Sequence, residues 1–189
     1  MEMVRRHSTA CAYLARMVSR FTPLASEYAF LCGLLHDIGI AAALIVLGEQ
    51  KRTEAGFDPA TLAMALQQCH QEASATVASL WRLPADVTLV LGHHHDVVIN
   101  GLVHPLAAVV ALAEDLTRDA GLGIVLDGHN CDVTSDNALA HARSALGFDS
   151  ARMEKLRKEA GKLLSTLERG AVMAAVASKS RPKAQRSMR

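Results

Sequence analysis

The sequence predicts an all-α fold of about seven helices, and three observations support that prediction. Apolar residues recur at three- and four-residue steps along most of the chain, as at Leu62, Leu66 and Cys69. Residues that start or stop helices, such as Asp58-Pro59 and Gly147, separate those stretches. No segment sustains the two-residue alternation of a half-buried strand.

Length and composition limit the class of protein. The 189 residues give room for one domain with a sizeable core. No run approaches the roughly 18 to 20 continuous apolar residues of a membrane span, and no secretory signal follows Met1. We therefore expect a cytoplasmic protein with no membrane contact. A net charge of +1 and 4% aromatic residues give no electrostatic or stacking basis for nucleic-acid binding.

Four cysteines stand far apart without a CxxC motif, on segments that otherwise have the pattern of buried helices: Cys11, Cys32, Cys69 and Cys131. We expect reduced core cysteines rather than disulfides or a zinc-thiolate site.

The N-terminal part should form two helices. An amphipathic helix is expected over about 8–20, with His7 at its entrance, where the side chain either faces water or is the first inward group. After Thr22-Pro23, a helix should start at Ser26 and run to His36-Asp37, where Gly39 ends it.

The middle of the chain should be helical as well. From Asp58-Pro59 the pattern predicts one long helix, or two joined near His70. Pro84 opens a helix whose apolar face continues into His94 and His95, and His104-Pro105 opens a third. In that third helix, Glu114 and Asp115 lie on either side of the apolar stripe.

The C-terminal part contains one segment, 124–135, that the pattern does not assign. A helix should follow over 136–146, and a last amphipathic helix should start at Asp149-Ser150. Residues 1–176 are expected to form the domain. Residues 177–189, which are basic and lack acids, should form a disordered tail.

The adjacent pair His36-Asp37 is the central chemical feature of the sequence. Neighbouring side chains on a helix point about 100° apart, so both can face one spot only where the helix ends or other helices surround it. A His and an Asp at the buried end of an apolar helix need a hydrogen bond, a salt bridge or a metal. Imidazole with carboxylate suits several transition metals, whereas a simple cap or a salt bridge to an arginine is the alternative for Asp37.

Further groups that can bind metal lean inward in the expected helices. Together with the central pair, they form this candidate set: His7, His36, Asp37, His70, His94, His95, and Glu114 or Asp115. Taken singly, His7 could be a solvated helix start, and His70 a core or surface histidine.

The order and spacing of these residues resemble the HD superfamily of metal-dependent phosphohydrolases, with its pattern H…HD…D. The stretches Arg6-His7-Ser8, Gly33-Leu34-Leu35-His36-Asp37-Ile38-Gly39, Trp81-Arg82-Leu83-Pro84 and His94-His95-Asp96 are similar to those of the HDOD branch, the HD-related output domain of bacterial signalling proteins. The resemblance runs from Arg5 to about Leu167 and implies an HD-like helical bundle.

The resemblance also implies roles. His7, His36, Asp37 and the late acid would hold one divalent ion, with Asp37 placed to bridge, and His70, His94 and His95 match positions of a second. The resemblance thus implies one or two divalent transition metal ions, which would be Fe, Mn, Zn, Ni or Co. Glu114 takes the place of the family's Asp, and Asp115 is the other candidate.

Three departures from the family pattern stand out. Ile40 replaces a lysine that would meet a phosphate, and the Gly-Tyr-Pro signature of cyclic-di-GMP phosphodiesterases is absent after His95-Asp96. Six residues precede His7, where related domains carry a helical region. The chain is therefore expected to be a shortened variant or a fragment.

Two main functions follow from the resemblance. The first is a metal-binding signalling module that binds a signalling protein or a nucleotide. The second is a metal-dependent phosphohydrolase, in which Asp37 orients a metal-activated water and His70 or His95 protonates the leaving oxygen. By position, Arg5, Arg6 and Arg82 would meet the substrate phosphate. An inert helical scaffold is the third possibility, and it predicts no bound metal.

Overall fold

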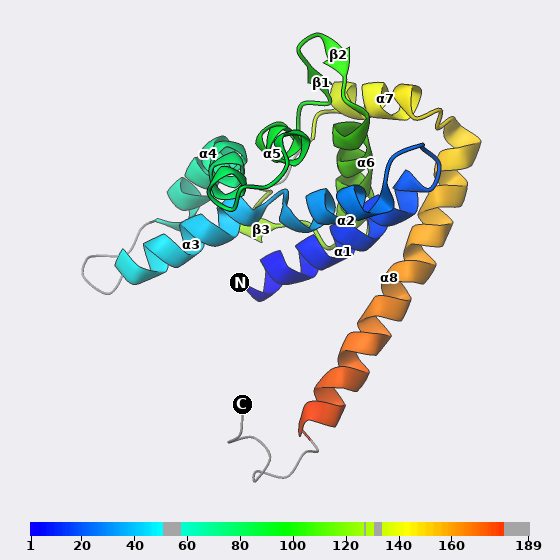
Figure 1. Cartoon of the computed structure of the whole chain (residues 1–189). Coiled ribbons are helices and arrows are strands. Elements are labelled where there is room, and N and C mark those ends of the chain that lie inside the picture. The colour runs from blue at the N-terminus through cyan, green and yellow to red at the C-terminus, as the bar shows by residue number, and fades with distance from the viewer. Residues whose placement is uncertain (51–57, 127, 131–133, 180–189) are drawn as a thin grey trace.

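The structure, a computed structural model, describes residues 1–50, 58–126, 128–130 and 134–179. Within these ranges it confirms the all-α prediction, and two short hairpins accompany the helices (Figure 1). The helices are α1 (Glu2–Ser19), α2 (Ser26–Leu35), α3 (Ile38–Gln50), α4 (Pro59–Leu80), α5 (Ala85–Gly92), α6 (Pro105–Asp119), α7 (Asp136–Ala145) and α8 (Ser150–Lys179). The strands are β1 (Val98–Ile99), β2 (Leu102–Val103), β3 (Val125–Leu126) and β4 (His129–Asn130).

Helix α6 forms the centre of the bundle. Every residue from Leu106 to Thr117 is buried, because α1 and α2 pack against one side of the helix and α7 packs against another. The sequence predicted only one inner stripe on this helix. The structure buries it all round, which explains why its acids, Glu114 and Asp115, are both removed from solvent.

Helix α1 begins at Glu2, about six residues earlier than the apolar pattern predicted. Glu2 lies in the first turn, where a negative charge interacts favourably with the helix dipole, and it accepts a hydrogen bond from Arg5 at 2.9 Å. His7 is therefore inside the helix rather than at its entrance, and its side chain is fully buried.

Two glycines allow the helices around the His-Asp pair to approach closely. A Cβ atom at Gly33 would lie 2.8 Å from the carbonyl oxygen of Cys11, so α2 packs directly on α1. A Cβ atom at Gly39 would lie 2.2 Å from the carbonyl oxygen of His70. Gly39 is the second residue of α3, so it does not end a helix as expected. It lets the turn between α2 and α3 touch α4.

Helix α4 is a single helix, and its end explains one of the motifs. Trp81 caps it, Arg82 adopts a left-handed conformation with φ of 56°, and the amide of Leu83 bonds to the carbonyl of Ala78. This is the Schellman arrangement, which Pro84 then prevents from continuing as helix. The Trp-Arg-Leu-Pro stretch is thus a helix stop between α4 and α5.

Helix α5 ends at Gly92, earlier than predicted, so His94 and His95 lie in the turn that follows it. Leaving the helix allows these consecutive side chains to face the same side. The β1–β2 hairpin comes next, and the sequence analysis did not anticipate it. Its signal was Asn100-Gly101, whose positive φ angles of 53° and 79° suit a tight turn between antiparallel strands.

The C-terminal helix α8 packs on the core through Met153, Leu156, Ala160 and Leu164. Its later part extends away from the bundle (Figure 1). The expected tail overlaps this helix at 177–179, and 180–189 lie outside the described residues. The boundary at residue 176 and the disorder of the tail stay predictions.

One described stretch, Ser26–Leu47, is long and apolar enough to cross a membrane, with mean hydropathy 2.2 and 39% of it buried. This differs from the sequence analysis, which expected no run of that kind. In the structure the pair separates α2 from α3, and both side chains are fully buried against other helices. The absence of membrane contact and the cytoplasmic location stay predictions.

Candidate metal centre

The buried carboxylate of Asp37 is surrounded by imidazole rings from α1, the α2–α3 turn, α4 and the turn after α5. One oxygen, Oδ2, lies 3.4 Å from Nε2 of His7 and 3.2 Å from Nε2 of His36. The other, Oδ1, lies 3.7 Å from Nε2 of His70 and 3.3 Å from Nε2 of His94. The structure therefore brings together the rings that the sequence analysis expected to converge on Asp37.

The same four rings are fixed from behind by backbone carbonyls. Nδ1 of His36 bonds to the carbonyl of Gly33 at 3.0 Å, and Nδ1 of His94 bonds to that of Leu91 at 2.9 Å. Nδ1 of His70 bonds to the carbonyl of Leu66 at 2.9 Å, and Nδ1 of His7 bonds to the carbonyl of Leu122 at 2.9 Å. A carbonyl only accepts, so each Nδ1 carries the hydrogen and each Nε2 turns a lone pair toward Asp37.

With neutral rings, this arrangement brings many acceptors together around one carboxylate. Nε2 of His7 and Nε2 of His36 lie 3.0 Å apart, so two neutral rings would set two lone pairs against each other unless a proton or a metal ion lies between them. Among the described residues, neither oxygen of Asp37 nor Nε2 of His94 has a hydrogen-bond partner. Buried acceptors without donors are costly. A cation satisfies all of them at once, so the residues present fit a metal.

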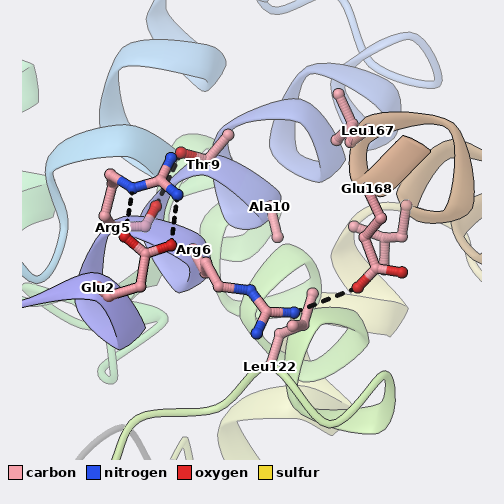
Figure 2. A pocket seen from close by; sticks show the side chains of 9 residues that line it. Glu2, Arg5, Arg6, Thr9, Ala10, Leu122, Leu167 and Glu168 are labelled. Carbon is pink, nitrogen blue, oxygen red and sulfur yellow. Dashed lines mark hydrogen bonds and ion pairs between the residues drawn. The ribbon is translucent and has the colours of Figure 1, made fainter. Parts of the chain in front are cut away.

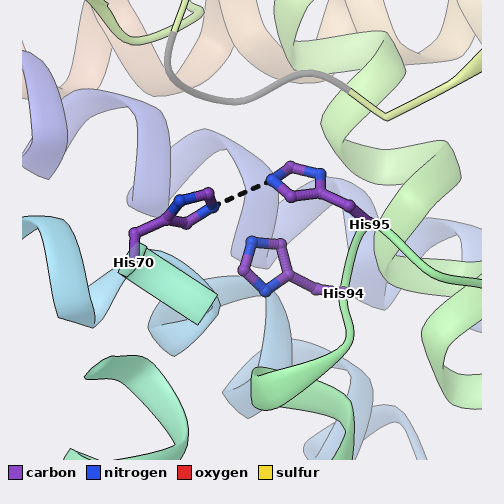
Figure 3. Close-up of side chains that lie close together, drawn as sticks. All are labelled: His70, His94 and His95. Carbon is purple, nitrogen blue, oxygen red and sulfur yellow. Dashed lines mark hydrogen bonds between the residues drawn. The ribbon is translucent and has the colours of Figure 1, made fainter. Parts of the chain in front are cut away.

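The acceptors divide into two groups, each compact enough for one ion. Nitrogen and oxygen atoms of His7, His36 and Asp37 lie within 4.8 Å of one another, and so do those of His70, His94 and His95. Figure 3 shows His70, from α4, facing the two consecutive histidines, with Nε2 of His70 2.9 Å from Nε2 of His95. One oxygen of Asp37 faces each group, so the carboxylate stands between them.

Burial and charge set the protonation of the centre. Burial, aided by His36, lowers the pKa of His7 to about 4, and burial lowers the pKa of His95 to about 2. Burial opposes charge on His36 as well, but the Asp37 carboxylate outweighs it and raises the pKa of His36 well above its ordinary value. Burial alone would raise the pKa of Asp37, yet His36 and His94 hold it well below its usual range. In the metal-free protein, His36 is therefore the cation beside Asp37.

The two candidate late acids have different surroundings. Glu114 is fully buried, and its Oε1 lies 3.5 Å from Nδ1 of His95. Asp115 instead forms an ion pair with Arg118 on the same helix, at 2.7 Å. Of the two, Glu114 is the one that contacts the histidine cluster.

Two hydroxyl groups support the centre, and the sequence analysis singled out neither of them. Ser74 of α4 donates to the carbonyl of His36 at 2.6 Å and accepts from the amide of Gly39 at 3.0 Å, so it ties the His-Asp turn to α4. Thr134 lies between His95 and Glu114, 3.0 Å from each. Ser74 follows His70 by four residues, a helical spacing that could have indicated a shared face. Nothing in the sequence indicated Thr134.

The three arginines expected to meet a phosphate are less well placed than their sequence positions suggested. Arg5 is bonded to Glu2, and Arg6 pairs with Glu168 of α8 at 3.3 Å, around a surface pocket of about 340 Å³ (Figure 2). Arg82 is exposed in the turn that follows α4. Ile40, in place of the family's lysine, is fully buried in a small apolar cluster with Val4, Leu66 and Ile124.

The cysteines do not extend the centre. Cys11 and Cys32 are free and buried as expected, and burial raises the pKa of Cys32 to about 12, which keeps it a thiol. Cys69 is exposed on α4, contrary to the expectation of a core position. Cys131 lies outside the described residues.

Comparison with known protein families identifies part of this chain. The model of the HDOD domain family matches residues 1–97, which include α1 to α5 and every histidine of the cluster. No curated protein and no solved structure matches this chain.

Proposed function

The chain belongs to the HDOD domain family, a group of HD-related modules associated with signal transduction, and we propose that it is a metal-binding regulatory module of a bacterial signalling protein. In this proposal it holds two divalent transition metal ions, drawn from Fe, Mn, Zn, Ni and Co. The occupied centre fixes the relative positions of α1, α2, α4 and α5. The module then acts by binding a signalling protein or a nucleotide.

The observation that carries the proposal is the environment of Asp37. Its two oxygens are fully buried, accept no hydrogen bond from the described residues, and each face two Nε2 atoms. A protonated His36 supplies one proton to Oδ2, but Oδ1 and Nε2 of His94 then remain buried acceptors 3.3 Å apart. A chain that kept these residues only as a scaffold would leave this pair unsatisfied.

The ligands would divide between two metal positions. His7, His36 and Oδ2 of Asp37 would hold one ion, and His70, His94, His95 and Oδ1 of Asp37 would hold the other. The backbone carbonyls behind the rings keep each Nε2 deprotonated and aimed at the centre. When bound, such ions supply Lewis acidity and lower the pKa of a water ligand.

A metal-dependent phosphohydrolase is the second candidate, favoured by the complete ligand set and by the position of His95. The His95 side chain is 13% exposed, whereas those of His7, His36 and His94 are fully buried, so His95 is at the rim of the centre. Asp37 would orient the attacking water there, and His70 or His95 would protonate the leaving oxygen. Within the described residues, Ile40 replaces the family's lysine, and Arg5 and Arg6 are bound to Glu2 and Glu168, which favours the regulatory role.

Metal analysis of the purified protein tests the first proposal. We expect about two equivalents in the wild type and none in Asp37→Ala, because both positions share that carboxylate. Asp115→Ala is the matched control, since Asp115 is a buried acid paired with Arg118 rather than with the cluster. If the wild type contains no metal after purification without chelators, only the inert helical scaffold remains as an interpretation.

Phosphate release from generic phosphoesters, with Mn, Fe, Ni or Co supplied, separates the two candidates. The regulatory module should show no release above that of Asp37→Ala. Release that requires Asp37 and falls in His95→Ala would make the protein an enzyme.

A further inference from the structure

Thr134 connects the metal-competent histidines to a part of the chain that the family match does not cover. It lies between β4 and α7, beyond residues 1–97, and its side chain is buried. Its hydroxyl bonds to Oε2 of Glu114 at 3.0 Å and to Nδ1 of His95 at 3.0 Å. It therefore joins an acid of the central helix α6 to a histidine at the rim.

The chemistry of a hydroxyl fixes the direction of both bonds. A threonine has one hydrogen to donate, and here it goes to the carboxylate oxygen of Glu114. The oxygen of Thr134 must then accept from Nδ1 of His95. This places the hydrogen of His95 on Nδ1 and leaves Nε2 free to face His70, 2.9 Å away.

His95 differs from the other four rings in how it is held. His36, His70 and His94 are fixed by carbonyls three or four residues back, and His7 is fixed by the carbonyl of Leu122. Among the five rings of the described cluster, His95 is the only one whose Nδ1 bonds to a side chain, that of Thr134. Because its side chain is also the most exposed of the five, it can turn outward if that bond is lost.

We propose that Thr134 is a positioning residue for the second metal position: held by Glu114, its hydroxyl aligns Nε2 of His95 through the bond to Nδ1, so occupation of that position depends on Thr134. The inference rests on the proposed function and deepens it. The first position, at His7, His36 and Asp37, makes no bond to Thr134 and should be filled regardless.

Thr134→Val tests this by removing the hydroxyl while keeping the shape of the side chain. In a Co²⁺ titration of the metal-depleted full chain, we expect two binding steps in the wild type. In the variant, the second step should weaken by about 10- to 100-fold and the first should stay unchanged. Thr134→Ser should restore the second step. Thr117→Val is the control, because it removes another buried hydroxyl, one that bonds only to the carbonyl of Ala113.

The outcomes distinguish the two proposals. Two wild-type steps that persist unchanged in Thr134→Val would overturn the role of Thr134 and leave the metal centre standing. A wild type that binds no Co²⁺ would overturn both. If Thr134→Val does not fold, ¹⁵N NMR of the metal-free wild type decides: His95 should carry its hydrogen on Nδ1, and a hydrogen on Nε2 would contradict the proposal.

Discussion

At the scale of single residues, the centre combines histidine Nε2 lone pairs with one proton that His36 retains. The ordinary pKa of a histidine is 6.5, and that of His36 is raised well above it by Asp37. His36 therefore holds a proton at neutral pH in the metal-free protein. An ion bound at the first position must displace that proton, because it needs the same Nε2 lone pair.

Metal affinity at the first position should therefore rise with pH. Below the raised pKa of His36, we expect about one proton released per ion, and an apparent affinity that increases about tenfold per pH unit. Calorimetry in two buffers of different ionisation enthalpy measures the released proton. His141→Gln, which changes an exposed histidine of α7, should leave it unchanged. Affinity that is flat between pH 6 and 8 would show that His36 is already neutral.

The same pair predicts the pH range in which the metal-free protein is stable. The raised pKa of His36 contributes stability that is complete below pH 6.5 and is lost as pH rises through the folded value. The lowered pKa of Asp37 contributes stability that is present above pH 3.8 and is lost as pH falls. The contribution of this pair should thus be largest between these limits, whereas the lowered pKa values of His7, about 4, and of His95, about 2, remove stability as pH falls below 6.5.

Gly39 makes the closest residue-level contact of the His-Asp turn. A methyl group there would meet the carbonyl of His70, so Gly39→Ala must push α4 away from Asp37. We expect a loss of about 1–3 kcal/mol in the free energy of unfolding, as for other overpacked sites, together with loss of metal. Denaturant unfolding and metal analysis measure the two effects.

Gly161→Ala is the matched control for Gly39→Ala. Gly161 is in α8, and a Cβ atom there meets nothing within 4 Å. That substitution should raise stability by up to about 1 kcal/mol, since alanine favours a helix more than glycine does. If Gly39→Ala behaved in the same way, the close packing of the turn against α4 would be wrong.

At the scale of elements, the centre depends on how helices end. The two adjacent pairs, His36-Asp37 and His94-His95, both lie just outside a helix. Within a helix such neighbours diverge, so the breaks after α2 and α5 are what direct each pair to one point. Ser74 then ties the first break to α4.

Ser74→Ala should loosen this connection between elements. It leaves the buried carbonyl of His36 and the buried amide of Gly39 without their partner, which costs about 1–3 kcal/mol. Ser79→Ala on the same helix is the control, because its exposed hydroxyl bonds only to the carbonyl of Ala75. The melting temperature and the metal content should both fall in Ser74→Ala, and neither should fall in Ser79→Ala. Equal effects of the two substitutions would show that the Ser74 bridge has no special role.

At the scale of the whole molecule, the histidines of the centre come from separate parts of the bundle. Ions bound there would link α1, the α2–α3 turn, α4 and the turn after α5, and would stabilise only the folded chain. At a free metal concentration 100 times the dissociation constant, binding adds about 2.7 kcal/mol per ion to the free energy of unfolding.

Metal removal should accordingly lower the melting temperature. We expect a drop of several degrees on adding a chelator, and recovery when a divalent transition metal is restored. Differential scanning fluorimetry measures both, with Asp37→Ala as the control that should not respond. An identical melting temperature in the presence and absence of chelator would contradict a metal that bridges the helices.

Much of this fold follows from local sequence alone. Helix periodicity and cap residues predicted the helices α2, α4, α6, α7 and α8. These signals can be detected in the sequence because they act between residues a few positions apart. The apolar run after Gly39 became the separate helix α3, and the start of α1 and the end of α5 were misplaced, because apolar spacing alone does not mark where a buried helix begins or ends. The β1–β2 hairpin was missed although Asn100-Gly101 signalled its turn.

By itself, the sequence determined the residue types of the candidate centre, the His-Asp pair and the family pattern. Only the tertiary structure decided that each oxygen of Asp37 faces two rings, that Glu114 rather than Asp115 contacts the cluster, and that Thr134 and Ser74 support it. The reason is physical. Ligand geometry depends on contacts between residues up to 115 positions apart, such as that of His7 with Leu122, and such contacts exist only after the helices have packed.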